Sequence, residues 1–154
     1  MEDLIGLRPV EPDDKEFCYE TIRVGMGPHA IATFGEWDEA AQRRRFEERW
    51  ATWPFQIILM DGTPAGLFSV EDLSDHIFLR MICLRPAYHG QGIGSQLIGA
   101  LIARAESEEL PIRLRCLKAN PAKQLYDRLE FQVEEEQDVR WVMLRKPAGS
   151  APVT

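Results

Sequence analysis

The feature that most constrains the fold is a glycine-rich segment between an apolar run and an amphipathic stretch. Residues 76–84 (HIFLRMICL) are almost wholly apolar apart from Arg80 and predict a buried strand. Residues 88–94 (YHGQGIG) follow, and from Ile93 apolar side chains recur at steps of one, three and four positions, which predicts a helix. Glycine lets the backbone approach a ligand closely, and the start of a helix presents unpaired N–H groups. The segment therefore predicts a strand-to-helix loop that can bind an anion such as a phosphate.

The spacing of the glycines separates this loop from two common phosphate-binding motifs. The pattern GxGxxG fails, because its last position falls on Ser95 when counted from Gly90 and on Leu97 when counted from Gly92. The P-loop pattern GxxxxGK[ST] also fails, since Ser95 stands five residues after Gly90 and no lysine is near. A turn that uses glycine for purely structural reasons remains an alternative reading of the loop alone.

The other patterns predict one mixed α/β domain over residues 1–147 and a flexible tail over 148–154. An Asp61-Gly62 turn predicts a β-hairpin, and Asp13 or Asp14 is a candidate N-cap. Residues 25–36 contain three glycines and Pro28 and predict a loop. The expected strands are 4–9, 55–60, 65–71, 76–84, 112–117, 131–135 and 139–144. The expected helices are 13–24, 37–50, 121–129 and one that starts at Ile93 and is ended by Pro111.

Composition excludes several classes of protein. The chain has 154 residues, with 18 Lys plus Arg against 25 Asp plus Glu and a net charge of -7, which argues against a duplex nucleic-acid binder. No apolar stretch approaches the roughly 20 residues that span a bilayer, and the acidic N-terminus predicts no secretory signal. The three cysteines form no CxxC pair and the three histidines have no metal-ligand spacing. We therefore expect a cytoplasmic protein with free thiols, no metal, and no membrane or nucleic-acid partner.

Two motifs together resemble a known family. Residues 84–97 (LRPAYHGQGIGSQL) resemble the acetyl-CoA loop of the GNAT superfamily of N-acetyltransferases, which has Arg or Gln, two free positions, Gly, one free position, and Gly or Ala. Residues 120–131 (NPAKQLYDRLEF) resemble a second motif of that family, with Asn, Ala two residues later, Leu-Tyr and a closing Gly-Phe. The two motifs stand in the family's order and spacing. The order of strands and helices also agrees over roughly residues 4–145.

The resemblance implies a fold and a co-substrate. The fold is a twisted, mostly antiparallel mixed sheet, flanked by helices on both faces and splayed between strands 76–84 and 112–117. The co-substrate is acetyl-CoA, whose pantetheine arm would pair with the backbone around Cys83 like an extra strand, while its pyrophosphate would lie on loop amides. The cofactor-binding residues that the resemblance implies are Ile82, Cys83, Leu84, His89, Gly90, Gln91, Gly92, Ile93, Gly94, Ser95, Asn120, Ala122 and Tyr126.

The implied reaction moves an acetyl group to a primary amine through a tetrahedral intermediate. It needs a neutral amine, a hydrogen-bond donor for the oxyanion, and a proton for the departing thiolate. Backbone amides near Leu84 can supply the donor. Tyr126 is the candidate general acid, because a phenol with a pKa of ~10 can protonate a thiolate whose conjugate acid lies near ~8.5. The alternative is a tyrosine that packs its ring on the sheet and bonds its hydroxyl to a backbone carbonyl.

The sequence departs from the family at two motif positions. His89 stands where the family usually has Arg or Gln, so one cofactor contact is altered. Glu130 stands where the second motif closes with Gly, so the helix must end with strain or with a different turn.

A third departure concerns the general base. Many relatives carry a Glu in the strand before the loop, where this chain has Arg80 and Met81. The candidate replacements are Glu71 and His76, with Asp72 beside them, and an amine made neutral through water alone is equally open.

Three functions remain to be compared. The first is an acetyl-CoA-dependent N-acetyltransferase with a small-molecule or peptide amine as acceptor, and a homodimer is compatible with it. The second is a non-catalytic acyl-CoA sensor, suggested by the missing strand Glu. A generic nucleotide-binding protein is disfavoured by the glycine spacing. By resemblance, the segment with Phe34, Trp37, Trp50 and Trp53 borders the acceptor pocket.

Overall fold

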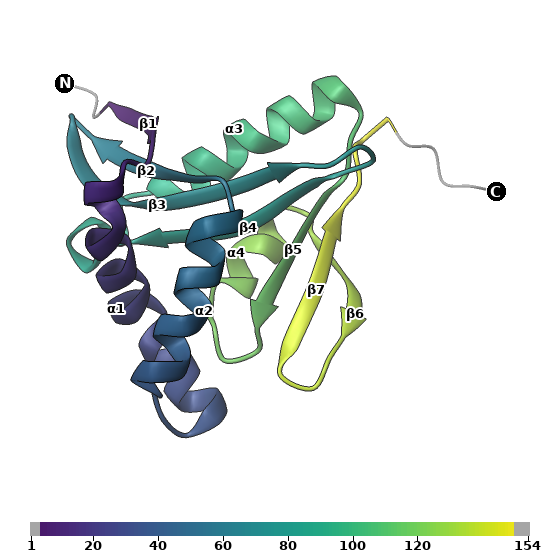
Figure 1. Ribbon diagram of the computed structural model, residues 1–154. Helices are drawn as coiled ribbons and strands as arrows, with labels where there is room; N and C mark the ends of the chain where they lie inside the picture. Colours follow the sequence, from purple (N-terminus) through teal and green to yellow (C-terminus); the bar gives the residue numbers. More distant parts are fainter. Residues whose placement is uncertain (1–3, 150–154) are drawn as a thin grey trace. The chain divides into compact units, whose positions relative to one another are not determined.

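The structure is a computed structural model that describes residues 4–149 (Figure 1). Its seven strands are hydrogen-bonded in the order β1-β2-β3-β4-β5-β7-β6. The β4–β5 pair is parallel, whereas the β1–β2, β2–β3, β5–β7 and β6–β7 pairs are antiparallel. This order confirms the predicted mixed α/β class with a mostly antiparallel sheet. Of the predicted tail, residues 150–154 lie outside the described residues.

The chain divides into two compact units. The first contains residues up to Val70 together with Arg80–Ile93, and the second contains Glu71–Leu79 together with the residues from Gly94 onward. The single domain expected over residues 1–147 stays a prediction. None of the helices in residues 4–149 is long and apolar enough to span a membrane.

The first unit packs two long helices on antiparallel strands. Its complete elements are β1 (Ile5–Pro9), the 3-10 turn η1 (Pro12–Asp14), α1 (Lys15–Phe34), α2 (Glu39–Thr52), β2 (Phe55–Met60) and the 3-10 turn η2 (Pro86–Tyr88). It also contains the part of β3 (Thr63–Asp72) that ends at Val70 and the part of β4 (Ile77–Leu84) that starts at Arg80. Its core joins one face of the strands to both helices and consists of Cys18, Tyr19, Phe46, Phe55, Ile57, Leu67, Met81 and Cys83. On β2 and β4, these core residues occupy alternate positions, which face the same side of the sheet.

The predicted loop over residues 25–36 is wrong, because α1 continues without a break to Phe34. A Cβ added to Gly25 would lie 2.5 Å from the Cys83 sulfur, so glycine lets this helix press against β4. That packing outweighs the low helix propensity of the segment. The helix holds Pro28 in its interior and ends at Gly35, whose φ of 88° is left-handed and whose N–H donates to Ile31 O at 2.8 Å.

The first hairpin follows the sequence prediction more closely than the helix caps do. Asp38 caps α2, since its carboxylate accepts from the Ala41 N–H at 3.1 Å. Asp14 precedes α1, but its carboxylate makes no cap bond to that helix and instead accepts from the Glu11 N–H at 2.7 Å. The β2–β3 hairpin turns through Asp61 and Gly62, both with positive φ, as a type I′ turn requires.

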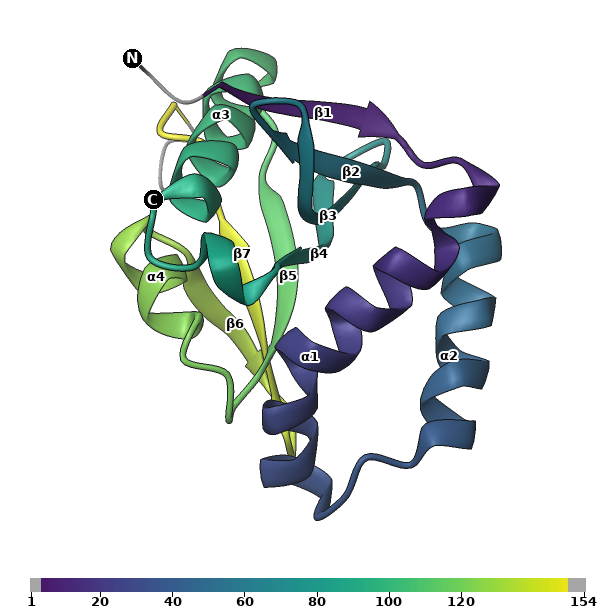
Figure 2. The same cartoon turned by 90° about the vertical axis from the view of Figure 1, so that its left-hand side faces the viewer.

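The second unit is built around three strands and two helices (Figure 2). Its elements are the β3–β4 turn within Glu71–Leu79, α3 (Ile93–Glu108) from Gly94, β5 (Ile112–Leu117), α4 (Lys123–Arg128), β6 (Gln132–Glu136) and β7 (Arg140–Arg145). The parallel pairing of β4 with β5 covers Ile77–Leu79 and Ile112–Leu114. Figure 2 shows α3 and α4 on the same side of β5 and β7. These helices bury Leu97, Ile98, Leu101, Ala105 and Tyr126.

The turn after α4 shows how the chain replaces the family's glycine. Glu130 adopts a φ of 71°, the left-handed conformation that glycine occupies at the end of a helix. The Glu130 N–H donates to Asp127 O at 3.1 Å and the Phe131 N–H donates to Tyr126 O at 3.0 Å, which is the Schellman pattern. Of the two expected outcomes, the structure therefore shows the strained one, in which the usual turn is kept by a non-glycine residue.

Candidate functional site

The glycine loop is open to solvent and fixed at its end. Residues 89–92 are exposed, whereas Ile93, the first residue of α3, is buried. Gly90 and Gly92 have φ values of 73° and 77°, and nothing lies within 4 Å of a Cβ added to either. Glycine is thus required at both positions by the backbone conformation and not by a lack of space for a side chain. A loop of this shape at the start of a helix can direct backbone N–H groups at an anion.

Two side chains of the loop form hydrogen bonds to backbone carbonyl oxygens that precede them in the chain. His89 Nε2 lies 2.9 Å from the carbonyl oxygen of Leu84, so the ring N–H donates to the last residue of β4. Gln91 Nε2 donates to Ala87 O at 3.0 Å. His89, predicted to bind the cofactor, therefore also fastens the loop to the strand that precedes it.

The backbone at the end of β4 packs directly against the backbone of β3 at Gly66. A Cβ added to Gly66 of β3 would lie 2.2 Å from Cys83 O and 2.9 Å from Leu84 Cα, so the two backbones touch there. Ala65 O accepts from the Arg85 N–H at 2.8 Å. Sequence reasoning missed Gly66, although an isolated glycine inside an apolar strand is a signal of close backbone approach. The backbone of Cys83 and Leu84, the predicted partner of the pantetheine arm, is thereby fixed in position.

Both cysteines that flank the predicted site are neutral thiols. Cys83 is buried and its Sγ donates to Thr21 O at 3.4 Å, and burial raises the pKa of this thiol to about 12. Burial likewise raises the pKa of the Cys116 thiol to about 11. A thiolate is the nucleophilic form, so neither cysteine is set up to attack an acyl group at neutral pH.

Tyr126 is placed in α4 with its ring buried. The side chain is 7% exposed, and its ring meets that of Phe131 edge-on with centroids 5.7 Å apart. Burial, and secondly the nearby Cys116 thiol, raise the pKa of the Tyr126 phenol above its usual range. The hydroxyl is therefore protonated at neutral pH, which is the form that a general acid needs.

Asn120 begins the turn that leads into α4. Its Oδ1 accepts from the Ala122 N–H at 2.9 Å, and its backbone oxygen accepts from the Lys123 N–H at 3.4 Å. Because Oδ1 is engaged, the side-chain amide nitrogen is the group that Asn120 can offer to a ligand as a donor.

The candidate bases lie at the end of β3 and in the turn that follows it. His76 Nδ1 lies 2.7 Å from Asp75 Oδ1, and this contact lowers the pKa of the Asp75 carboxyl. Glu71 is half-buried near the end of β3, and Asp72 accepts from Arg104 at 2.8 Å. The roles of Glu71 and His76 as a base stay predictions. Within residues 4–149, no three His, Cys, Asp or Glu side chains gather as metal ligands.

The strand positions where many relatives carry a Glu hold Arg80 and Met81 in this chain. The Arg80 guanidinium lies over the Trp53 ring, 5.5 Å from its centroid, and Met81 is buried in the core of the first unit. Neither a guanidinium nor a thioether supplies the carboxylate base that a Glu would provide at this position.

A small, open hollow lies between α1 and α2 within the first unit. Trp37 lines it, whereas Trp50 and Trp53 pack against the core and Phe34 is half exposed. The lining residues are Tyr19, Ile22, Trp37, Gln42, Arg45, Phe46 and Arg49. Among these residues, the sequence places Trp37 beside the acceptor pocket and Arg45 in a run of three arginines that reads either as a site for phosphates or an acidic acceptor or as a solvated helix face.

Comparison with known proteins places the fold among acetyltransferases. The chain is similar to the structure of the PaiA N-acetyltransferase of Thermoplasma acidophilum in complex with coenzyme A, with 19% identity, a TM-score of 0.69, and coverage of 93% of this chain and 99% of that one. It is similar to an acetyltransferase of Thermus thermophilus, with 16% identity, a TM-score of 0.70, and coverage of 92% and 96%. It is also similar to the ribosomal-protein-S18-alanine N-acetyltransferase of Escherichia coli, with 19% identity, a TM-score of 0.66, and coverage of 98% and 100%.

The assignment to a family rests on a match of the sequence to a family model. No curated protein matches the chain. The model of the acetyltransferase (GNAT) family matches residues 18–131, which include the glycine loop and both predicted motifs. The chain therefore belongs to the acetyltransferase (GNAT) family.

Proposed function

We propose that this chain transfers an acetyl group from acetyl-CoA to a primary amine by direct transfer. The observation that carries the proposal is the exposed glycine loop with positive φ at Gly90 and Gly92, placed at the start of α3 in a chain of the GNAT family. A related fold has been solved with coenzyme A, which supports the use of an acyl-CoA.

The proposed cofactor contacts use backbone groups more than side chains. Amides of His89 to Ser95 would hold the pyrophosphate, helped by the positive end of the α3 dipole. The backbone of Ile82, Cys83 and Leu84 would pair with the pantetheine arm as an added strand. Asn120 would donate its side-chain amide to the same arm, and Ala122 would pack beside it.

In the proposed reaction, the amine nitrogen forms a bond to the acetyl carbon and the carbon–sulfur bond breaks. Backbone N–H groups near Leu84 would stabilise the negative charge that develops on the carbonyl oxygen. Tyr126 would give its phenolic proton to the leaving sulfur. The raised pKa of Tyr126 makes this proton harder to release, but a sulfur leaving in the same dry surroundings is also a stronger base than in water.

The extra proton of the amine must leave as well. If the amine arrives as an ammonium ion, Glu71 or His76 would take that first proton through water, or solvent would take it. The neutral amine must lose a further proton once its nitrogen has bonded to the acetyl carbon, and this proton would pass through water to the Tyr126 phenolate and restore the phenol. The three free, buried cysteines fit a reducing compartment, so we place the activity in the cytoplasm.

Thermal unfolding with and without acetyl-CoA tests the cofactor, with NAD and ATP as controls. At a hundredfold excess over Kd, a ligand adds about 2.7 kcal/mol to the free energy of unfolding. For a domain of this size that raises Tm by roughly 5 to 10 °C. A rise with acetyl-CoA alone is expected, whereas no rise, or an equal rise with NAD, would overturn the proposal.

A second function, a non-catalytic acyl-CoA sensor on the same fold, is favoured by Arg80 and Met81 in place of the strand Glu. Acetyl-CoA binding without acetylation of any amine in a broad panel would select it.

A further inference from the structure

The chain carries its positive charge mostly on arginine. It has 14 arginines and 4 lysines, although lysine is one of the commonest residues of soluble proteins. The two side chains differ toward a thioester, because a guanidinium keeps its charge, whereas a lysine ammonium loses a proton more readily and then attacks an acyl carbon. The surroundings of the four lysines therefore decide where this chain is open to acylation.

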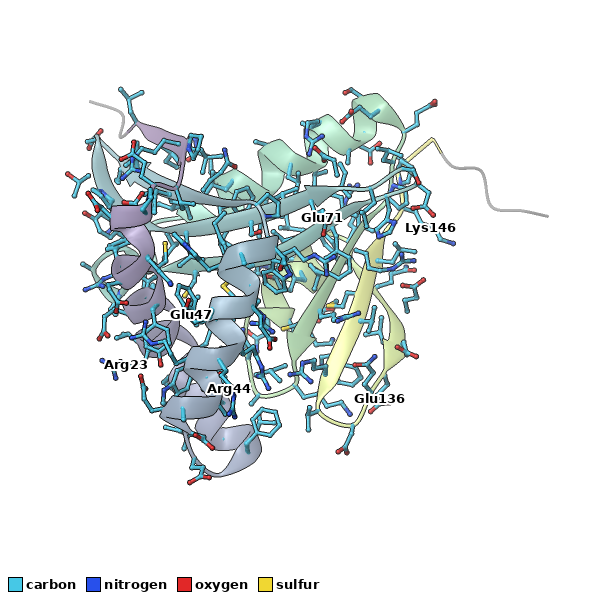
Figure 3. The ribbon with its side chains drawn as sticks, viewed as in Figure 1. Arg23, Arg44, Glu47, Glu71, Glu136 and Lys146 are labelled. Carbon is cyan, nitrogen blue, oxygen red and sulfur yellow. The ribbon has the colours of Figure 1, made fainter. Side chains whose placement is uncertain are left out.

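Lys15 of α1 is held by a carboxylate from the neighbouring helix. Its Nζ lies 2.5 Å from Oε2 of Glu47, which Figure 3 labels on α2. To react with a thioester, the amine must first leave this carboxylate, because an ammonium has no free electron pair. An ion pair at the surface lowers the population of free amine by a factor of up to about five, so Glu47 protects Lys15.

Lys118 and Lys123 are each held twice, by a carboxylate and by an aromatic ring. Lys118 Nζ lies 2.8 Å from Oε1 of Glu136, and Lys123 Nζ lies 2.9 Å from Oδ2 of Asp127. Both ammonium groups also lie over the Trp141 ring, 4.7 and 5.4 Å from its centroid. A cation–π contact stabilises the charged form, so it adds to the protection that the ion pairs give.

Lys146 differs from the other three lysines in its surroundings. It is exposed where the chain leaves β7, as Figure 3 shows. Exposure alone does not set it apart, since Lys118 is exposed as well. The difference lies in the partners, because within residues 4–149 neither a carboxylate nor an aromatic ring holds the Lys146 amine.

The carboxylate that feels the charge of Lys146 already has a stronger partner. Arg113 donates two hydrogen bonds, of 2.8 and 2.9 Å, to Glu134 of β6. These bonds are the main cause that lowers the pKa of the Glu134 carboxyl, and the charges of His76 and Lys146 contribute less. Glu134 is therefore held by Arg113 and leaves the amine of Lys146 accessible.

The backbone on both sides of Lys146 is fixed. Arg145 donates to Glu106 Oε1 at 2.6 Å and to Leu129 O at 2.9 Å, and the Ala148 N–H donates to Glu106 Oε2 at 2.9 Å. These bonds involve the neighbours of Lys146 and not its side chain, so an acyl group on its amine breaks none of them. Modification at this position is compatible with the native fold.

We propose that Lys146 is the site at which this chain is itself acetylated, by direct reaction of its amine with the thioester of acetyl-CoA. The neutral amine nitrogen forms a bond to the acetyl carbon, the carbon–sulfur bond breaks, and coenzyme A leaves as a thiolate. The nitrogen then gives its extra proton to water, and an uncharged amide replaces the ammonium. The inference goes beyond the proposed function and does not depend on it, because no group of the glycine loop or of α4 takes part.

Mass spectrometry that resolves each lysine tests the site. The full chain is incubated with excess acetyl-CoA in mildly alkaline buffer and is then cut with a glutamate-specific protease, because acetylation blocks cleavage at lysine. The initial rate of acetylation is expected to be about two- to fivefold higher at Lys146 than at Lys15, and about fivefold or more higher than at Lys118 and Lys123. Equal rates at all four lysines, or a faster reaction at a held lysine, would overturn the proposal.

Release of a held lysine tests the physical cause. Glu47→Gln removes the carboxylate that holds Lys15, so acetylation of Lys15 is expected to rise about two- to fivefold while that of Lys146 stays unchanged. Glu48→Gln is the control, because Glu48 is the next residue of α2 and pairs with no lysine in the described part of the chain. Thermal unfolding confirms that both variants fold. No rise at Lys15 in Glu47→Gln, or an equal rise in Glu48→Gln, would overturn the argument that the ion pair protects.

A second donor separates direct reaction from catalysis by the chain. The short thioester S-acetyl-N-acetylcysteamine carries no phosphate for the glycine loop to bind. Direct reaction predicts that both donors modify Lys146 first, whereas a preference for Lys146 with acetyl-CoA alone would mean that a bound cofactor directs the reaction and would overturn the proposal. Failure to acetylate any added amine overturns the proposed function and leaves the assignment of Lys146 intact.

Discussion

The His89 ring donates from Nε2 to the carbonyl oxygen of Leu84 at 2.9 Å, and so joins the glycine loop to the end of β4. In the family this motif position usually carries Arg or Gln. Here its side chain is turned to the strand that precedes the loop, which makes His89 a positioning residue for the loop backbone.

Replacing His89 is expected to weaken acetyl-CoA binding with little effect on stability. A single hydrogen bond contributes about 0.5–1.5 kcal/mol, so His89→Ala is expected to raise Kd for acetyl-CoA by roughly 2- to 13-fold. His89 is exposed, so the Tm without ligand should stay within a degree or two of wild type, about the shift that a few tenths of a kcal/mol cause. Calorimetric titration measures Kd, and an unchanged value would show that the link does not position the loop.

Gly66 is expected to tolerate no side chain. Gly66→Ala places a Cβ 2.2 Å from Cys83 O, so we expect a loss of about 1–3 kcal/mol in the free energy of unfolding together with weaker acetyl-CoA binding. Gly6→Ala is the control, because its Cβ would lie 3.8 Å from Leu59 Cβ, an ordinary contact in β1. Urea unfolding of both variants checks this, and equal stabilities would contradict the close approach of β3 to β4.

Tyr126→Phe is expected to fold and to bind acetyl-CoA while turning over slowly. General acid catalysis contributes roughly 10²- to 10⁴-fold, so kcat should fall within that range. Because burial raises the pKa of Tyr126 above its usual value of 10.0, the wild-type phenol stays protonated and its ionisation should cause no fall in kcat below that pH. A variant with unchanged kcat across the pH range would remove Tyr126 from the reaction.

Glu130→Gly is expected to stabilise the chain by about 0.5–1 kcal/mol, since glycine adopts the observed φ of 71° without strain. The long contact of 3.5 Å between Glu130 and Arg145 is exposed on the glutamate side and offsets little of this gain. Glu48→Gly, inside α2, is the control and should lose about 1 kcal/mol. Thermal unfolding measures both, and a lower Tm for Glu130→Gly would contradict the strain.

Asp14 provides a prediction on pH. Arg8 donates two hydrogen bonds to this carboxylate, at 2.8 and 3.1 Å, and thereby lowers its pKa below the usual 3.8. A lowered pKa in the folded state stabilises the fold above pH 4 and loses that effect as pH falls through the folded value. Asp14→Asn should therefore cost about 1 kcal/mol at pH 7 and progressively less below pH 4. A cost that stays constant across this range in urea unfolding would contradict the ion pair.

The sequence predicts the local features of this fold well. The strand–loop–helix unit around Gly90, the hairpin at Asp61 and the helix expected over 37–50, which the structure has at Glu39–Thr52, each depend on neighbouring residues, and each is confirmed. The error over residues 25–36 arises because Gly25 is required by Cys83, which stands 58 positions later in the chain. Local composition contains no information on that contact.

The hollow could not be predicted for the same reason. Tyr19 and Arg45 belong to different helices, and the packing of α1 on α2 brings them to one surface. From the sequence, the run Arg43-Arg44-Arg45 is either a site for phosphates or an acidic acceptor or, more commonly, a solvated helix face, and the structure gives Arg43 and Arg45 different surroundings.

The central claim is acetyl transfer, and the most direct measurement follows an isotopically labelled acetyl group from acetyl-CoA into a panel of primary amines by mass spectrometry. We expect a labelled N-acetyl product that forms in step with free coenzyme A and forms much more slowly with Tyr126→Phe. Tight binding of acetyl-CoA without labelled product from any amine would contradict it and would identify the chain as an acyl-CoA sensor.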